Sequence, residues 1–118
     1  MTYSTIYNGL KKTIQENLDT VIFTDRKSRK FVQYALDHSD GKVSITLDIP
    51  VIECDENEKT KLSTILSGKA YDIRTGKEIA YQEYFWGEEL ENATKISHQI
   101  FTEVFKSKPD YSLEIEMF

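Results

Sequence analysis

Two periods of apolar residues divide the chain into helical and extended segments. In the first segment apolar residues recur every three or four positions, at Tyr3, Ile6, Tyr7, Leu10 and Ile14. This spacing predicts an amphipathic helix over residues 3–17. The same spacing returns near the C-terminus, at Leu90, Ala93, Ser97, Ile100, Phe101, Val104 and Phe105. It predicts a longer helix over residues 88–107, which Pro109 prevents from continuing.

A period of two marks the strands. Its clearest instance is the alternation of apolar with polar residues over residues 43–49, which is typical of a strand with one face in the core. Two shorter apolar runs, residues 21–23 and 31–36, flank a polar segment and predict a β-hairpin. Gly41 after Asp40 supplies the tight connection that leads into the next strand.

The remaining segments complete the element order. Residues 56–67 follow an acidic stretch and predict a short helix, although their Thr and Ser residues also allow a strand. A second hairpin is predicted over residues 71–85 with Gly76 in its turn, and alternation over residues 111–117 predicts a final strand. The expected fold is a single α+β domain over residues 1–118 with the order α-β-β-β-α-β-β-α-β. An antiparallel sheet of five to six strands packs with an N-terminal helix, a short middle helix and a long C-terminal helix.

Composition and charge narrow the classes of function. The 118 residues carry 15 Lys and Arg against 20 Asp and Glu, a formal net charge of −5, so the overall field repels nucleic acid and anionic lipid. The N-terminal segment is not continuously apolar, and no apolar run approaches the ~20 residues that cross a bilayer. A single cysteine, Cys54, excludes an intramolecular disulfide and favours a reducing compartment. We therefore expect a cytoplasmic protein that neither enters a membrane nor binds nucleic acid in general.

Residues with catalytic or metal-binding chemistry are sparse. His38 and His98 are far apart in the sequence, and neither has a second ligand at metal-binding spacing. The acidic segment 55–58 could ligate a cation, but it also suits the N-terminus of the predicted middle helix, which is the interpretation that we favour. Cys54 follows apolar residues and is expected to be a buried, unreactive thiol. We expect no cofactor, no metal and no catalytic residues, with an enzyme built from scattered residues as an alternative.

The turn of the first hairpin concentrates positive charge against the sign of the whole chain. It holds Arg26, Lys27, Arg29 and Lys30. These cations either keep the hairpin tip soluble and meet acidic surface, or they hold a phosphate group or RNA with Tyr34 available to stack on a base. The first interpretation is favoured, and anion binding is kept as a second hypothesis.

An aromatic cluster lies at the end of the second hairpin: Tyr81, Tyr84, Phe85 and Trp86. Neighbouring residues of a strand point to opposite faces, so the four rings cannot all enter one core. Rings on the second face would form a partner-binding or dimer surface, unless a helix covers them.

The element order, acidity and size of residues 3–107 resemble those of the type III secretion chaperones and their wider non-secretory relatives. The resemblance implies a non-catalytic dimer that holds an extended segment of another protein on apolar surface. The terminal strand over residues 111–118 departs from that pattern. Our leading hypothesis is a non-catalytic, chaperone-like protein-binding module of the cytoplasm, whose partner is another protein or a second copy of the chain.

Overall fold

The computed structural model describes residues 2–118, with the exception of the Asp40 side chain. Over these residues it is an α+β fold with three α-helices and a six-stranded antiparallel sheet, in the predicted order. In chain order the elements are α1 (Thr2–Gln15), β1 (Thr20–Asp25), β2 (Phe31–Asp37), β3 (Ser44–Pro50), α2 (Glu56–Ile65), β4 (Gly68–Tyr71), β5 (Glu78–Trp86), α3 (Leu90–Gln99) and β6 (Leu113–Met117). Short 3-10 turns cover Ser39–Gly41 and Val51–Glu53. None of the helices over these residues reaches the length and apolar character that crossing a bilayer requires.

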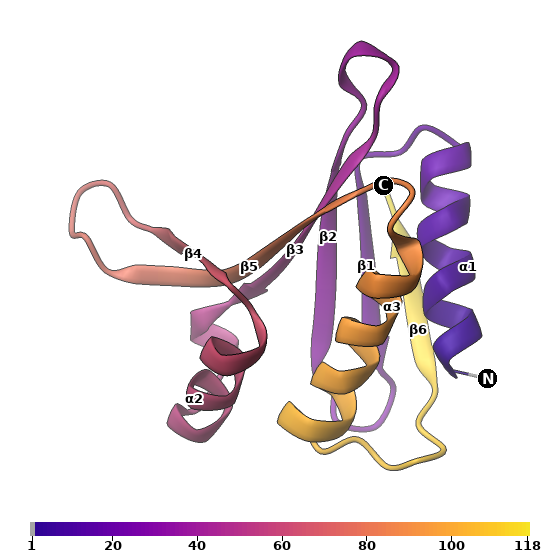
Figure 1. Cartoon of the computed structure of the whole chain (residues 1–118). Coiled ribbons are helices and arrows are strands. Elements are labelled where there is room, and N and C mark those ends of the chain that lie inside the picture. The colour runs from indigo at the N-terminus through magenta and orange to yellow at the C-terminus, as the bar shows by residue number, and fades with distance from the viewer. Residues whose placement is uncertain (1) are drawn as a thin grey trace.

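The sheet pairs the first strand of the chain, β1, with the last, β6. Its strand order is β4-β5-β3-β2-β1-β6, and every neighbouring pair is antiparallel. Helices α1 and α3 lie side by side in front of β1, β2 and β6, while α2 lies near the β4–β5 end (Figure 1). All three helices contribute buried side chains to one core on this face of the sheet, which we call the covered face. The opposite face, called the open face, carries no helix of the described chain.

Strand alternation places one side of every strand except β4 in the core. The strand residues of the hydrophobic core cluster are Val21, Phe23, Val32, Tyr34, Leu36, Ile45, Leu47, Ile49, Tyr81, Phe85 and Leu113. Tyr34 is fully buried, and its hydroxyl donates to the carbonyl of Ala93 at 2.9 Å while sharing a hydrogen bond with Ser97 Oγ at 2.5 Å. These contacts fix β2 to α3. Burial raises the pKa of Tyr34, with the Ser97 hydrogen bond opposing it in part, so the hydroxyl stays neutral.

The middle segment is a helix, and its strand alternative is wrong. Asp55 precedes it with extended backbone, and its Oδ1 accepts from the backbone N–H of Glu58 at 2.8 Å. Glu58 Oε1 in turn accepts from the backbone N–H of Asp55 at 2.9 Å. This reciprocal capping box satisfies two backbone donors at the helix start. The acidic segment 55–58 thus caps α2, as favoured from the sequence.

The C-terminal helix is divided into two parts. Apolar spacing predicted one helix over residues 88–107, but α3 gives way to a π-helix, η3 (Ile100–Val104), in which Phe105 N–H donates to the carbonyl of Ile100 at 2.9 Å. Thr102 Oγ1 donates to the carbonyl of His98 at 2.9 Å across the junction. Such side-chain bonds to a helix carbonyl compete with the regular ladder. A widened turn still fits spacings of three and four, so the apolar pattern did not reveal it.

The second hairpin turns earlier than predicted. Asp72 Oδ1 accepts from the backbone N–H groups of Arg74 and Thr75 at 2.8 and 3.1 Å, which starts the turn directly after β4. Ile73, predicted to belong to the strand, therefore lies in the turn and is fully exposed.

Candidate functional site

Strand β5 separates the aromatic cluster between the two faces of the sheet. Tyr81 and Phe85 are buried in the core, so they cannot be part of a partner-binding surface. Tyr84 and Trp86 point to the open face and are 54% and 44% exposed. Their rings stack edge to face, with centroids 5.5 Å apart and planes at 85°. We call these two residues the aromatic pair.

The aromatic pair is set among small residues and carboxylates. In the register of the sheet Tyr84 lies opposite Thr46, and Thr46 lies opposite Ala35, so small side chains flank the Tyr84 ring. The charged side chains that the strands β1, β2, β3 and β6 place on the open face are all acidic: Asp37, Asp48, Glu114 and Glu116. The open face is therefore an acidic surface with two exposed rings near one end.

Asp48 is the most constrained of these carboxylates. It lies in register between Gln33 and Gln82. Its Oδ1 is buried and has no hydrogen-bond partner among the described residues. Burial raises the pKa of Asp48, and the two neighbouring amides lower it only in part. A carboxylate in this position is incompletely satisfied and would gain from an added donor.

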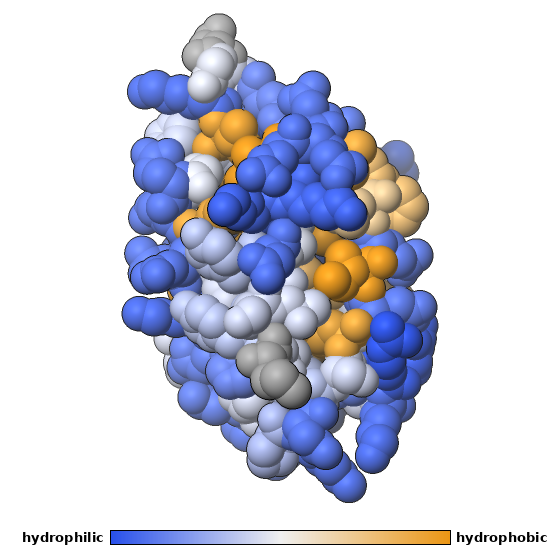
Figure 2. Space-filling model, turned by 90° about the vertical axis from the view of Figure 1, so that its right-hand side faces the viewer, coloured by the Kyte–Doolittle hydropathy of each residue, from blue (hydrophilic) through white to orange (hydrophobic). Residues whose placement is uncertain are grey.

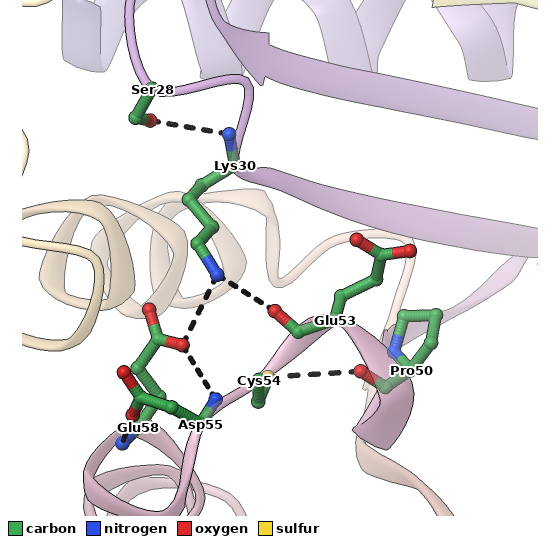
Figure 3. Close-up of polar contacts among 7 residues, drawn as sticks. All are labelled: Ser28, Lys30, Pro50, Glu53, Cys54, Asp55 and Glu58. Carbon is green, nitrogen blue, oxygen red and sulfur yellow. Dashed lines mark hydrogen bonds and ion pairs between the residues drawn. The ribbon is translucent and has the colours of Figure 1, made fainter.

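Two of the four cations in the first hairpin turn form ion pairs within the protein. Arg29 Nη1 lies 3.1 Å from Glu114 Oε2 at the surface. Lys30 Nζ lies 3.1 Å from Glu58 Oε1 and donates to the carbonyl of Glu53 at 2.7 Å, as Figure 3 shows. The Lys30 side chain is therefore a structural contact between β2 and the start of α2. An anion would have to compete with these carboxylates, so Arg29 and Lys30 are less available to it than the predicted four-residue site assumes.

The other predicted elements of that site also change. Tyr34 is fully buried and cannot stack on a base. Arg26 and Lys27 remain exposed at the turn. Lys27 lines a concave pocket of about 310 Å³ together with Lys106 and Lys108, which follow η3. No local pattern in the sequence links these two lysines to a turn about 80 residues earlier.

Cys54 lies next to Glu53, whose carbonyl accepts from Lys30, and its side chain is half-buried (Figure 3). Its Sγ is 3.7 Å from the carbonyl of Pro50. Burial, together with the charge of Glu58, raises the pKa of the thiol to about 11. The thiol is therefore protonated at neutral pH, and a protonated thiol is a poor nucleophile.

The histidines make separate local contacts. His98 Nδ1 shares a hydrogen bond with Tyr111 Oη at 2.7 Å, and their rings are stacked. His38 Nε2 lies 2.6 Å from the carbonyl of Leu18. Over the described part of the chain, no three His, Cys, Asp or Glu side chains gather in a group that could hold a metal ion.

Comparisons with known proteins leave the function to be argued from these surfaces. Scans against protein-family models, curated proteins and solved structures found no match to the chain. The two surfaces with chemistry to interpret are the open face around the aromatic pair and the pocket that Lys27 lines.

Proposed function

We propose that the chain is a non-catalytic protein-binding module, chaperone-like in role, whose open face binds a basic and apolar segment of another protein. The exposed aromatic pair on a sheet face without helices is the observation that carries the proposal. Tyr and Trp are the residues that most often anchor protein interfaces, because they bury a large area at a low cost in side-chain entropy. Small neighbouring side chains such as Thr46 and Ala35 leave both rings accessible to a partner.

Charge determines which partner fits. Glu114 is already paired with Arg29, but the other three acidic strand residues of the open face favour lysine or arginine in the partner. Lys42 Nζ already lies 5.9 Å from the centroid of Trp86, a contact of the kind that a partner cation would make with the rings. A second copy would instead oppose acidic groups to acidic groups, so we favour a different protein over a homodimer.

Trp86 is the only tryptophan of the chain, so intrinsic fluorescence reports directly on the proposed site. The probe is a short synthetic peptide that alternates lysine with leucine, and a glutamate-for-lysine peptide is its control. We expect a saturable change in Trp86 emission with the basic peptide alone. Tyr84→Ser should weaken that binding about tenfold, because loss of one anchor costs more than about 1 kcal/mol.

A matched variant separates anchoring from general attraction between opposite charges. Ile73→Ser alters a fully exposed apolar residue outside the strands, so it should leave the affinity unchanged. Equal affinity of Tyr84→Ser and the unaltered protein would overturn the proposal, as would the absence of saturation. A dimer in analytical ultracentrifugation that Tyr84→Ser dissociates would assign the open face to a second copy and would also overturn it.

A further inference from the structure

We propose that the pocket between the first hairpin turn and the segment after η3 binds a phosphate monoester. Three lysines from these two segments line it: Lys27, Lys106 and Lys108. The serines Ser28, Ser107 and Ser112 lie among them, and the volume is about 310 Å³. We call this site the lysine pocket. It is independent of the aromatic pair, which lies on β5.

The two segments are held together by their own hydrogen bonds. Buried Asp25, at the end of β1, accepts from Ser107 Oγ at 2.5 Å through Oδ2 and from the backbone N–H of Lys27 at 2.9 Å through Oδ1. The backbone N–H of Arg26 donates to the carbonyl of Ser112 at 3.1 Å. The lysine backbones are thus positioned before a ligand arrives, which lowers the entropic cost of binding.

The three lysines keep their charge available. None of the ion pairs among the described residues includes Lys27, Lys106 or Lys108. Two carboxylates also line the pocket, those of Asp25 and Asp110. Asp25 accepts the hydrogen bonds described above, and no ion pair among the described residues joins it to a lysine. The pocket carries an excess of positive charge in a protein with a formal net charge of −5.

The donors match a dianion with several oxygens. Lysine ammonium groups bind phosphate as point charges. The Ser28 hydroxyl bonds to the Asp25 carboxylate and accepts from the backbone N–H of Lys30 at 3.2 Å, so it helps to shape the turn. Ser112 contributes a hydroxyl at the lining. A single carboxylate would use fewer of these donors than a phosphate group with three terminal oxygens.

Backbone conformation sets both segments apart. Over the described chain three residues other than glycine have positive φ, and two of them are Arg29 at 64° and Lys106 at 56°. Arg29 belongs to the hairpin turn, and Lys106 lines the pocket. Such conformations are uncommon for residues with a Cβ, and here they turn the chain in the hairpin and directly after η3.

Size and charge favour a small ligand over a nucleic acid. A volume of about 310 Å³ is at the lower end for ligand sites and suits one phosphate with the group attached to it. The acidic protein as a whole repels a polyanion. The ligand class is therefore a phosphate monoester, carried by a small molecule or by one phosphorylated side chain.

Amide chemical shifts in a titration of the full chain test the site. The probes are inorganic phosphate, glycerol phosphate, a phosphoserine peptide and its unphosphorylated form. We expect saturable shifts confined to the hairpin turn and to residues 106–112, and tighter binding above a pH of about 6, where the monoester becomes a dianion. The glycerol phosphate and phosphopeptide arms distinguish a small-molecule source from a protein source.

Substitutions make the test specific. Lys27→Ser and Lys106→Ser should each weaken phosphate binding at least about fivefold. Lys11→Ser removes an exposed cation from α1 and should leave binding unchanged. The proposal is overturned if phosphate gives no saturable shifts at tens of millimolar, if Lys11→Ser acts like Lys27→Ser, or if a short single-stranded RNA binds more tightly than every monoester. Trp86 fluorescence should not respond to phosphate, so this site and the open face can fail separately.

Discussion

Replacement of Glu58 by alanine tests the contact that joins the first hairpin to α2. Glu58 Oε1 accepts from Lys30 Nζ at 3.1 Å and from the backbone N–H of Asp55 at 2.9 Å. The Glu58 side chain is 11% exposed, whereas the Lys30 side chain is 32% exposed. Glu58→Ala therefore removes half of a capping box and one partner of a partly buried ion pair (Figure 3).

The magnitude follows from these two losses. A capping hydrogen bond stabilises a helix by about 1 kcal/mol. A hydrogen bond to a charged group contributes about 1.5–3 kcal/mol when buried. The lower end applies here, because Lys30 reaches solvent and keeps its bond to the carbonyl of Glu53 at 2.7 Å. We expect Glu58→Ala to lower the free energy of unfolding by about 2 kcal/mol, and Glu58→Gln, which keeps an oxygen for Asp55, by about 1 kcal/mol.

Urea unfolding followed by fluorescence and circular dichroism measures these values. Glu56→Ala is the matched control, because Glu56 is also in the first turn of α2 but its side chain is 91% exposed in its pair with Lys59. That change should cost less than about 0.5 kcal/mol. A double-mutant cycle with Lys30→Met should give a coupling of about 1 kcal/mol. If Glu58→Ala is as stable as Glu56→Ala, the assigned role of this contact is refuted.

Three further predictions concern packing and pH. Gly9→Ala would place a Cβ 2.6 Å from Phe23 Cε1 and should lower the unfolding free energy by about 1–3 kcal/mol; an unchanged urea midpoint would contradict the close approach of α1 to β1. Asp48→Asn should stabilise the protein by about 1 kcal/mol at neutral pH. Because burial raises the pKa of Asp48 above its ordinary 3.8, its stability contribution is present below that value and lost as the pH rises, so the benefit of the amide should vanish in acid. Burial alone would raise the pKa of Asp25, but hydrogen bonds led by that of Ser107 outweigh it and lower the pKa. Asp25→Asn should therefore cost about 1–3 kcal/mol at neutral pH and progressively less as the pH falls below 3.8. A change in stability that is the same at all pH values would contradict the reasoning for Asp48 or for Asp25.

Local patterns predicted most of the elements because their signals lie within one turn or one strand. The alternation over residues 43–49 became β3, one residue displaced. The acidic segment 55–58 became a capping box, since its donors and acceptors are three residues apart. The π-turn in η3 and the early turn at Asp72 were missed because each depends on a hydrogen bond that apolar spacing does not encode.

Local patterns predicted only part of the candidate site. A period of two already required Tyr84 and Trp86 to leave the face that Phe85 occupies. The sequence of β5 does not specify which face of the sheet the helices cover. That choice comes from the packing of α1 against β1 and β6 and of α3 against Tyr34 of β2, and α1, β1 and β2 are distant from β5 in the sequence.

Charge pairing shows the same division. Composition established a net acidic chain with a basic turn, because those quantities are sums over residues. Whether a lysine in that turn is free depends on the residues that the fold brings to it: Lys30 pairs with Glu58, whereas Lys27 lines a pocket with Lys106. The pairing of β6 with β1 carries the segment after η3 to the hairpin turn, and no local signal in the chain specifies that long-range contact.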